Sequence, residues 1–270
     1  MHIFLMSGLG DEVALTGVVR EAKRTLPDEF IFVQCSRPEL FEGSPYVGFG
    51  KFQKKGTTQL TPWHSGKDFQ GNLVRYYARQ LGVTCLDDTP EIFLTDEEKA
   101  KAKKRLASFP GKKIAFDVFA TWTNRQWPID RFIDVARMLE KMGFMTIELG
   151  KKVPDNDGLY AKKRIKANLD LVDQLKVRET AAILSECDLY VGNDSGLMHL
   201  AAAVGTPQVA IFTISPWWAR TYWTTTPVFR NQPCRIECTF SCVKKERCIL
   251  EITVEDVMAA IGNALRRYPK

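Results

Sequence analysis

The residues whose types and spacing best suit chemistry lie in the run from Asn193 to Pro207. This run opens with a polar turn that holds Asp194, Ser195 and Gly196, and it continues into an alanine-rich segment that carries His199. A turn between a strand and a helix presents free backbone N–H groups and the positive end of the helix dipole, and both attract anions. Ser195 can donate to a phosphate, Asp194 can accept from a sugar or nucleotide hydroxyl, and His199 follows one helical turn later. The same residues also suit a simple helix cap and a satisfied interior histidine, so the pattern alone leaves both interpretations open.

A second polar loop carries Thr121, Thr123 and Arg125. It follows a strand-like apolar segment and precedes Trp127 and an amphipathic helix at residues 129–142. Hydroxyl donors, a fixed positive charge and a helix N-terminus together suit a diphosphate. The alternative is a loop in which Trp127 anchors the helix and Arg125 is solvated.

Near the N-terminus, residues 3–6 have the composition of a first strand, and residues 13–24 offer the apolar face of a helix. Between them lies a glycine-rich turn that contains Gly10 and Asp11. Its glycines allow a ligand to approach the backbone closely, and Asp11 stands at the start of the helix. A favourable charge at a helix N-terminus explains Asp11 equally well.

Four of the seven cysteines fall within fifteen residues, at Cys234, Cys238, Cys242 and Cys248. In a cytosolic chain such a cluster favours metal over disulfides, and four thiolates can hold iron or zinc in a tetrahedral site. All four ligand positions would then be filled, which makes the site structural rather than catalytic. Four free cysteines in a loop are the alternative.

The order of elements is that of an α/β protein, because apolar strand-like segments alternate with helical ones. Strands are expected at residues 3–6, 30–34, 46–49, 112–118, 144–149, 188–191 and 209–212. A capping box at Thr95–Glu98 begins a charged helix that ends near residue 108, where a new strand follows. We therefore expect two domains, residues 1–108 and residues 109–270, the second with a Cys-rich loop at 234–248.

The composition is that of an ordinary globular chain, since 45% of the 270 residues are hydrophobic and 26% are charged. No apolar run approaches the roughly 20 residues of a membrane span, and the N-terminus lacks the basic segment of a signal peptide. The expected compartment is cytoplasmic. A net charge of +6 permits an anionic partner but does not by itself indicate nucleic acid.

The run from Asn193 to Pro207 resembles glycosyltransferase family 9, the ADP-heptose:lipopolysaccharide heptosyltransferases and their relatives. That family has an Asn-Asp-Ser/Thr-Gly turn, a following histidine, an alanine-rich helix and a Gly-Thr-Pro stop. Gly10-Asp11 and Leu15-Thr16 fit the family's first turn and helix, and Trp127-Pro128 fits its second-domain loop. The resemblance spans most of residues 108–260 and a short part of the first domain.

This resemblance implies a GT-B-like fold, in which two Rossmann-like domains face each other across a cleft, here with a shortened N-terminal domain. It implies an inverting glycosyltransferase that moves a heptose-like sugar from an ADP-linked donor to an acceptor hydroxyl, by default on lipopolysaccharide. Asp11 would be the catalytic base, and Arg125 stands where the family has a phosphate-binding lysine. No catalytic metal is expected. The residues implied to bind the nucleotide-sugar donor are Thr121, Thr123, Arg125, Asp194, Ser195, Gly196 and His199.

Three further features carry expectations of their own. The Cys-rich loop is similar to that of the autotransporter heptosyltransferases, a family 9 branch with a structural iron site, although the spacing here is tighter. The closing helix at 255–267 is expected to pack back across the first domain, as in many two-lobed glycosyltransferases. The aromatic residues at 217–223 suit either stacking on a base or sugar, or closing the seam between the domains.

Other classes of function stay open. A short first domain suits a nucleotide-sugar-binding protein without turnover, although Asp11 in its expected place argues against it. In an active enzyme, the acceptor hydroxyl would belong to a carbohydrate, a protein side chain or a modified nucleic-acid base. The cysteines and the mild basicity also suit a metal-dependent nucleic-acid-binding protein, which would bind DNA or RNA in a salt-sensitive way.

Overall fold

The computed structural model describes most of the chain, namely residues 1–48, 56–62, 71–152, 164–213, 216–230 and 247–269. Its strands are β1 (His2–Phe4), β2 (Phe32–Gln34), β3 (Thr57–Gln59), β4 (Lys113–Asp117), β5 (Met145–Glu148), β6 (Leu169–Asp170), β7 (Leu189–Asn193), β8 (Gln208–Phe212) and β9 (Thr225–Phe229). Its α-helices are α1 (Leu9–Thr25), α2 (Leu73–Leu81), α3 (Asp96–Leu106), α4 (Ile129–Lys141), α5 (Val177–Ser185), α6 (Gly196–Ala203), α7 (Arg247–Leu250) and α8 (Val254–Arg267). Short 3-10 helices include η1 (Pro38–Phe41), η2 (Thr123–Arg125) and η4 (Trp217–Ala219).

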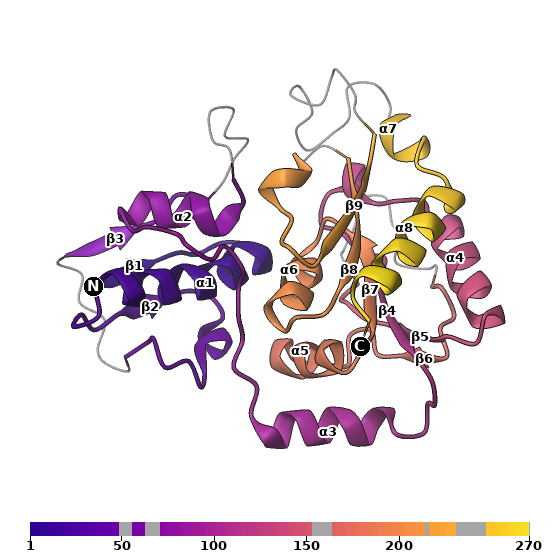
Figure 1. The fold of residues 1–270 in the computed structure, drawn as a ribbon, viewed down its shortest axis with the longest axis horizontal. Helices are drawn as coiled ribbons and strands as arrows, with labels where there is room; N and C mark the ends of the chain where they lie inside the picture. Colours follow the sequence, from indigo (N-terminus) through magenta and orange to yellow (C-terminus); the bar gives the residue numbers. More distant parts are fainter. Residues whose placement is uncertain (49–55, 63–70, 153–163, 214–215, 231–246, 270) are drawn as a thin grey trace.

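The strands form two parallel sheets, one in each half of the molecule (Figure 1). The smaller sheet has the order β2-β1-β3, and the larger has the order β6-β5-β4-β7-β8-β9. Parallel neighbours cannot be joined by a tight hairpin, so each connection needs a long crossover, and most crossovers here contain a helix. The alternation of strands and helices along the sequence therefore corresponds to parallel sheets, as expected for Rossmann-like domains.

Both faces of the larger sheet are covered, and successive residues of β4 point to opposite faces. Ala115 packs in the core beneath α5 and α6, whereas Ile114 and Phe116 pack in the core beneath α4 and α8. Helices α5 and α6 lie on the side turned toward α1 (Figure 1). The core beneath them continues into the smaller half, because Ile3 and Val18 belong to the same apolar cluster. One shared core thus holds the two halves together.

Most predicted elements occur within a few residues of their predicted bounds. The capping box at the start of α3 is confirmed, because Thr95 Oγ1 accepts from Glu98 N at 3.2 Å and Glu98 Oε2 accepts from Thr95 N at 2.8 Å. The strand predicted at 46–49 is wrong, since residues 46–48 form no strand and β3 takes the third place in the sheet. Strand β9 was not predicted, because it contains Pro227, which has no backbone N–H to donate. The sheet tolerates this missing donor because β9 lies at its edge.

Helix α3 packs on α5, and Arg178 of α5 links it to the smaller half. The buried Arg178 guanidinium donates to both carboxylate oxygens of Glu98 at 2.7 Å and to the carbonyls of Glu39 and Glu42 at 3.0 and 3.2 Å. This bonding lowers the pKa of Glu98 to about 2. Arg178 therefore joins three segments at one point, and the domain boundary near residue 108 stays a prediction.

The expectation for the closing helix is wrong. Helix α8 packs on α4 and on β7, β8 and β9, so it covers the larger sheet rather than the smaller half. Its inward residues Val257, Ile261 and Ala264 are buried in the core that α4 also covers. In the ranges that the structure describes, no helix combines the length and apolar content needed to cross a membrane.

Candidate active site

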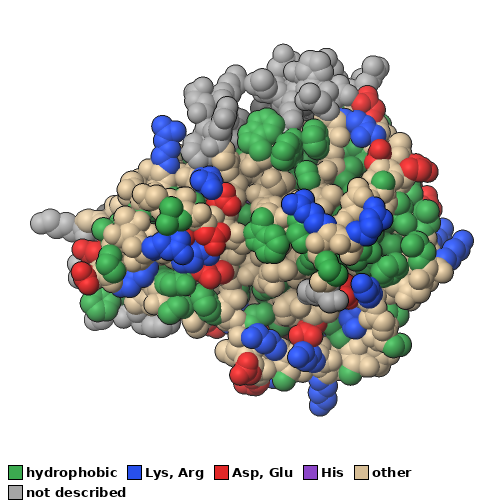
Figure 2. All heavy atoms as spheres, viewed as in Figure 1, with side chains coloured by type: hydrophobic (Ala, Val, Ile, Leu, Met, Phe, Trp, Pro, Cys, Tyr) green, Lys and Arg blue, Asp and Glu red, His purple; other side chains and the backbone are tan. Residues whose placement is uncertain are grey.

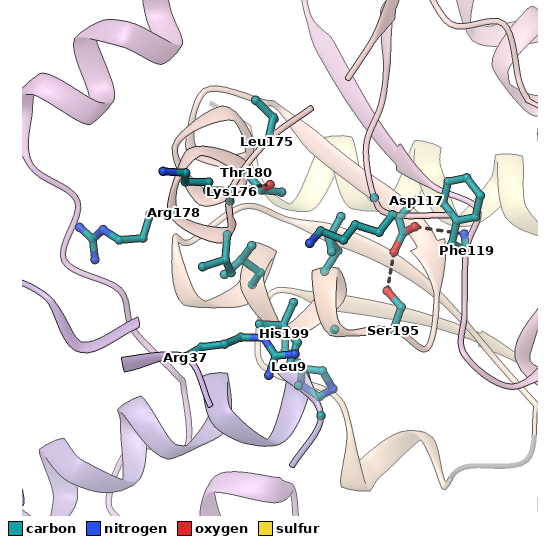
Figure 3. Close-up of a pocket in the computed structure, with 18 of the residues that line it drawn as sticks. Leu9, Arg37, Asp117, Phe119, Leu175, Lys176, Arg178, Thr180, Ser195 and His199 are labelled. Atoms are coloured by element: carbon teal, nitrogen blue, oxygen red, sulfur yellow. Dashed lines mark hydrogen bonds between the residues drawn. The ribbon is translucent and has the colours of Figure 1, made fainter. Parts of the chain in front are cut away.

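A cleft of about 1150 Å³ opens where the loops after β1, β4, β5 and β7 meet. Open α/β sheets bind ligands at the carboxyl ends of their strands, and these loops leave those ends. Figure 3 shows Leu9 and Arg37 of the smaller half and His199, Asp117 and Ser195 of the larger half, all of which line this cleft. The predicted site residues that line the cleft are Asp11, Thr121, Arg125, Asp194, Ser195, Gly196 and His199. Thr123 lies in η2, and its side chain is outside the described part of the chain.

The first turns of α1 and α6 touch at the cleft, and glycines make this contact possible. A Cβ atom on Gly10 would lie 2.5 Å from His199 Cδ2, and one on Gly196 would lie 2.8 Å from Leu9 Cβ. Neither distance is tolerated between real atoms, so any larger residue at these positions would push the helices apart. The two helices therefore bring their N-terminal ends, one from each half, to the same cleft.

His199 is both an interior histidine and a residue of the cleft, so the two interpretations of the motif coincide. The residue is 1% exposed, and Nδ1 lies 2.6 Å from the Tyr222 hydroxyl. Burial, and next the positive charge of Arg220, lower the pKa of His199 to about 4. The imidazole is consequently neutral at physiological pH, so it can offer a hydrogen bond but no positive charge.

Ser195 is the N-cap residue of α6, but its side chain makes no capping hydrogen bond. Its hydroxyl donates to Asp117 Oδ2 at 2.6 Å (Figure 3) and lies 3.3 Å from the Tyr190 hydroxyl. Asp117 also accepts from Phe119 N at 3.0 Å. Burial raises the pKa of Asp117 to about 7 despite these hydrogen bonds. Asp117 was not among the predicted site residues. The one feature of the sequence that pointed to it is its place as an acidic residue at the end of an apolar strand.

Arg125 lies against the polar turn after β7. Its Nε is 3.5 Å from Asp194 Oδ2, and its guanidinium stacks on the Trp122 ring at 4.1 Å from the centroid. The Arg125 side chain is 15% exposed and Asp194 only 2%. The solvated alternative for Arg125 is therefore wrong. Burial lowers the pKa of Arg125, but a guanidinium keeps its proton at physiological pH, so the cleft contains a fixed and largely desolvated positive charge.

Asp11 stands on the opposite side of the cleft, in the first turn of α1. Its Oδ2 accepts from Ser7 Oγ at 2.7 Å, and its Oδ1 accepts from the Tyr77 hydroxyl at 2.7 Å. Tyr77 comes from α2 and is fully buried, so packing holds its hydroxyl in place and this hydroxyl fixes the orientation of the Asp11 carboxylate. Each carboxylate oxygen has a second lone pair, which leaves Asp11 able to accept a further hydrogen bond from a molecule in the cleft.

The two polar loops of the larger half are joined through Asn193, which is completely buried. Asn193 Oδ1 accepts from Trp127 N at 3.0 Å, and Nδ2 donates to the carbonyl of Val118 at 2.9 Å. The Trp127 indole in turn donates to the carbonyl of Ile252 at 2.9 Å. Trp127 therefore anchors the start of α4, as the alternative interpretation expected, and Asn193 keeps the Arg125 loop next to the turn after β7.

The sequence profile of glycosyltransferase family 9 (heptosyltransferase) matches residues 73–245, which is well over half of the chain. This chain belongs to glycosyltransferase family 9. Lipopolysaccharide heptosyltransferase 3 of Escherichia coli K12 is 24% identical over 236 residues, which cover 78% of this chain and 63% of that protein. The matched stretches span 27% to 65% of the length of the curated relatives.

Solved structures share the fold. A family 9 glycosyltransferase from Veillonella parvula has a TM-score of 0.78 at 16% identity, over 98% of this chain and 97% of that chain. The dodecameric iron-containing heptosyltransferase TibC of enterotoxigenic Escherichia coli, in complex with ADP-D-β-D-heptose, has a TM-score of 0.74 at 17% identity. That match covers 99% of this chain and 76% of TibC. The predicted GT-B-like α/β fold is thereby confirmed.

The cysteine cluster is only partly visible in this family 9 chain. Cys234, Cys238 and Cys242 lie outside the described residues, and Cys248 is half-buried on α7. In the part of the chain that is described, no three His, Cys, Asp or Glu side chains are arranged to hold a metal ion. The iron or zinc site therefore stays a prediction.

The aromatic segment lies at the seam between the two halves, one of its two expected roles, because Asn72 of the smaller half donates to the carbonyl of Thr221. Trp218 and Trp223 are exposed, and Trp217 stacks on Phe229 of β9. Between them, Arg220 lines the cleft and Tyr222 contacts His199. A lone arginine among tryptophans gives no local signal of a site, so the sequence pattern does not predict Arg220 in the cleft.

Proposed function

We propose that this chain transfers a sugar from a nucleoside-diphosphate donor, ADP-heptose-like, to an acceptor hydroxyl, with inversion at the anomeric carbon. The observation that carries the proposal is one cleft in which a carboxylate, Asp11, faces a buried guanidinium, Arg125, and the N-terminus of α6. Glycosyl transfer needs both: a proton acceptor for the incoming hydroxyl and a positive site for the departing diphosphate.

The donor is proposed to bind on the larger half. Arg125 and the backbone N–H groups at the start of α6 would contact the diphosphate, because a guanidinium fork and a helix N-terminus both favour phosphate oxygens. Thr121 is exposed in the cleft and can donate its hydroxyl. Ser195 already donates to Asp117, so its role would be to fix the turn and not to hold the phosphate while that bond is made. The complex of TibC with ADP-D-β-D-heptose supports an ADP-linked sugar as the first candidate.

Asp11 is proposed as the base. Its carboxylate would take the proton of the acceptor hydroxyl while the acceptor oxygen bonds to the anomeric carbon and the bond from that carbon to the phosphate oxygen breaks. The electron pair of that bond leaves with the diphosphate, towards Arg125. Attack from the side opposite the leaving group inverts the anomeric configuration. Ser7 and Tyr77 hold the carboxylate in place for this step.

The first test is calorimetric titration with ADP, UDP, GDP and CDP. We expect ADP to bind selectively and Arg125→Ala to weaken it, because the variant removes the buried positive charge. Arg137→Ala is the matched control, since Arg137 is exposed on α4 and away from the cleft. Preference for another nucleotide would keep the transferase and change the sugar. No binding of any nucleotide would refute the proposed donor site.

The second test separates transfer from binding alone. Asp11→Asn keeps the size of the side chain but removes the base, so donor binding should be retained and transfer to a lipopolysaccharide-core acceptor lost. Wild-type protein that binds the donor without transferring to carbohydrate, protein or nucleic-acid acceptors would instead be a nucleotide-sugar-binding protein. On the face drawn in Figure 2, Lys and Arg are interspersed with Asp and Glu, whereas nucleic-acid binding favours a continuous basic stripe.

A further inference from the structure

Arg220 is a second arginine of the cleft, from a different loop than Arg125. It follows η4, which comes after β8, and its backbone N–H donates to the carbonyl of Trp217 at 3.0 Å. Although it lines the cleft, the residue is only 8% exposed. A guanidinium at this depth loses most of its hydration, so the structure must offer it compensating negative charge or hydrogen bonds.

The segment that carries Arg220 is held on both sides. Asn72, at the start of α2, donates through Nδ2 to the carbonyl of Thr221 at 3.2 Å, and Tyr222 lies 2.6 Å from His199 Nδ1. Asn72 belongs to the smaller half and is 4% exposed, and it also donates to the carbonyl of Asp88. Arg220 is consequently fixed between the two halves, next to the contact of His199 with Gly10.

Contacts with neighbouring residues give the relative positions of the two arginines. Tyr222, two residues after Arg220, lies 2.6 Å from His199 Nδ1, and the His199 ring lies against the first turn of α1, which presents Asp11. The segment that carries Arg220 is therefore next to His199 and to the Asp11 side of the cleft. Arg125 belongs to the loop after β4 and is held against the turn after β7. Together with burial, the positive charge of Arg220 lowers the pKa of both His199 and Arg125.

Two guanidiniums that repel each other across a buried cleft are suited to a ligand with two adjacent negative groups. Each guanidinium presents a planar fork of N–H donors that matches the oxygens of one phosphate. We propose that Arg220 binds the β-phosphate of the donor, the group attached to the sugar, while Arg125 binds nearer the nucleoside. Arg220 would then stabilise the charge that appears on the β-phosphate when the sugar leaves. This inference rests on the proposed donor site.

The test compares ADP with AMP, because only ADP has a β-phosphate. We measure the Kd of both nucleotides by calorimetry for wild-type protein, Arg220→Gln, Arg220→Lys and Arg125→Ala. Arg220→Gln should weaken ADP about tenfold or more and AMP by less than about threefold, as expected for loss of one charged hydrogen-bond pair. Arg220→Lys, which keeps the charge but loses the fork, should fall between wild type and Arg220→Gln.

A control and a folding measurement make the result decisive. Arg266→Gln removes one exposed charge from α8 and should leave both Kd values unchanged. Thermal melting establishes that each variant is folded, and Arg220→Lys carries the same comparison if Arg220→Gln does not fold. Equal weakening of ADP and AMP, or no weakening of ADP, would overturn the inference. If wild-type protein binds neither nucleotide, the proposed donor site itself fails, which is a separate outcome.

Discussion

Replacing Asp117 with Asn should change how the stability of this protein depends on pH. Asp117 is 2% exposed, and burial raises its pKa from 3.8 to about 7. Because the folded state holds this proton more tightly than the unfolded chain, the stability it contributes is fully present below about pH 3.8 and is lost as the pH rises through about 7. In the Asp117→Asn variant the amide oxygen can replace Oδ1 as the acceptor from Phe119 N, and the NH2 group replaces Oδ2 and can donate to Ser195 Oγ, so the side chain carries no charge at any pH.

The magnitude follows from the pKa. At about 1.36 kcal/mol for each pKa unit, this carboxylate lowers the free energy of unfolding by roughly 2.5 kcal/mol between pH 5 and pH 8. The variant lacks that loss. The difference in unfolding free energy, Asp117→Asn minus wild type, should therefore increase by roughly 2.5 kcal/mol over this pH range.

Urea unfolding at pH 5, 6, 7 and 8 measures that difference directly. Asp134→Asn, at an exposed position of α4, controls for the loss of one carboxylate and should show no comparable change with pH. A difference between Asp117→Asn and wild type that is constant from pH 5 to pH 8 would refute the reasoning. It would mean that Asp117 does not change its protonation state between pH 5 and pH 8.

Three further predictions concern the contacts around the cleft and the cysteine cluster. Gly10→Ala should lower the free energy of unfolding by about 1–3 kcal/mol in urea, since its Cβ would overlap the His199 ring. Gly8→Ala is the matched control, because its Cβ would have 3.7 Å to the nearest atom; equal losses in the two variants would contradict the overlap. Asn193→Ala should cost about 1–3 kcal/mol for each of the two backbone groups it leaves buried without a partner. It should also weaken ADP binding in calorimetry, and unchanged stability would show that water replaces the amide. Elemental analysis of purified protein should find iron or zinc near one atom per chain, and Cys238→Ser with Cys242→Ser should remove it; a metal-free wild-type protein with unaltered folding would exclude the site.

Local patterns determined much of the fold. The order of strands and helices, the parallel sheets and the capping box at Thr95–Glu98 follow from apolar periodicity and from residues within one turn of each other. The polar turn at Asp194–Gly196 and the loop at Arg125 were both recognisable because a strand ends and a helix begins there. The resemblance to family 9 rested on these same short runs, and the family profile agrees with it.

The packing of segments that are distant in the sequence could not be predicted from local patterns. Helix α8 has an apolar face that suits either half of the molecule, and only the assembled sheet decides which half it covers. The strand predicted at 46–49 failed for the same reason, because a sheet accepts the segment that reaches its edge in register rather than the most apolar one.

The sequence by itself determined where the site loops begin and which charged residues they carry, because those signals are local. Only the tertiary structure decided what each group does there. Ser195 donates to Asp117 across 78 residues of chain, and Tyr77 reaches Asp11 across 66. Burial raised the pKa of Asp117 and left His199 neutral, and the fold placed the charge of Arg220 near His199. Protonation and hydrogen bonding depend on desolvation and on partners in space, and neither quantity is encoded in any short stretch of residues.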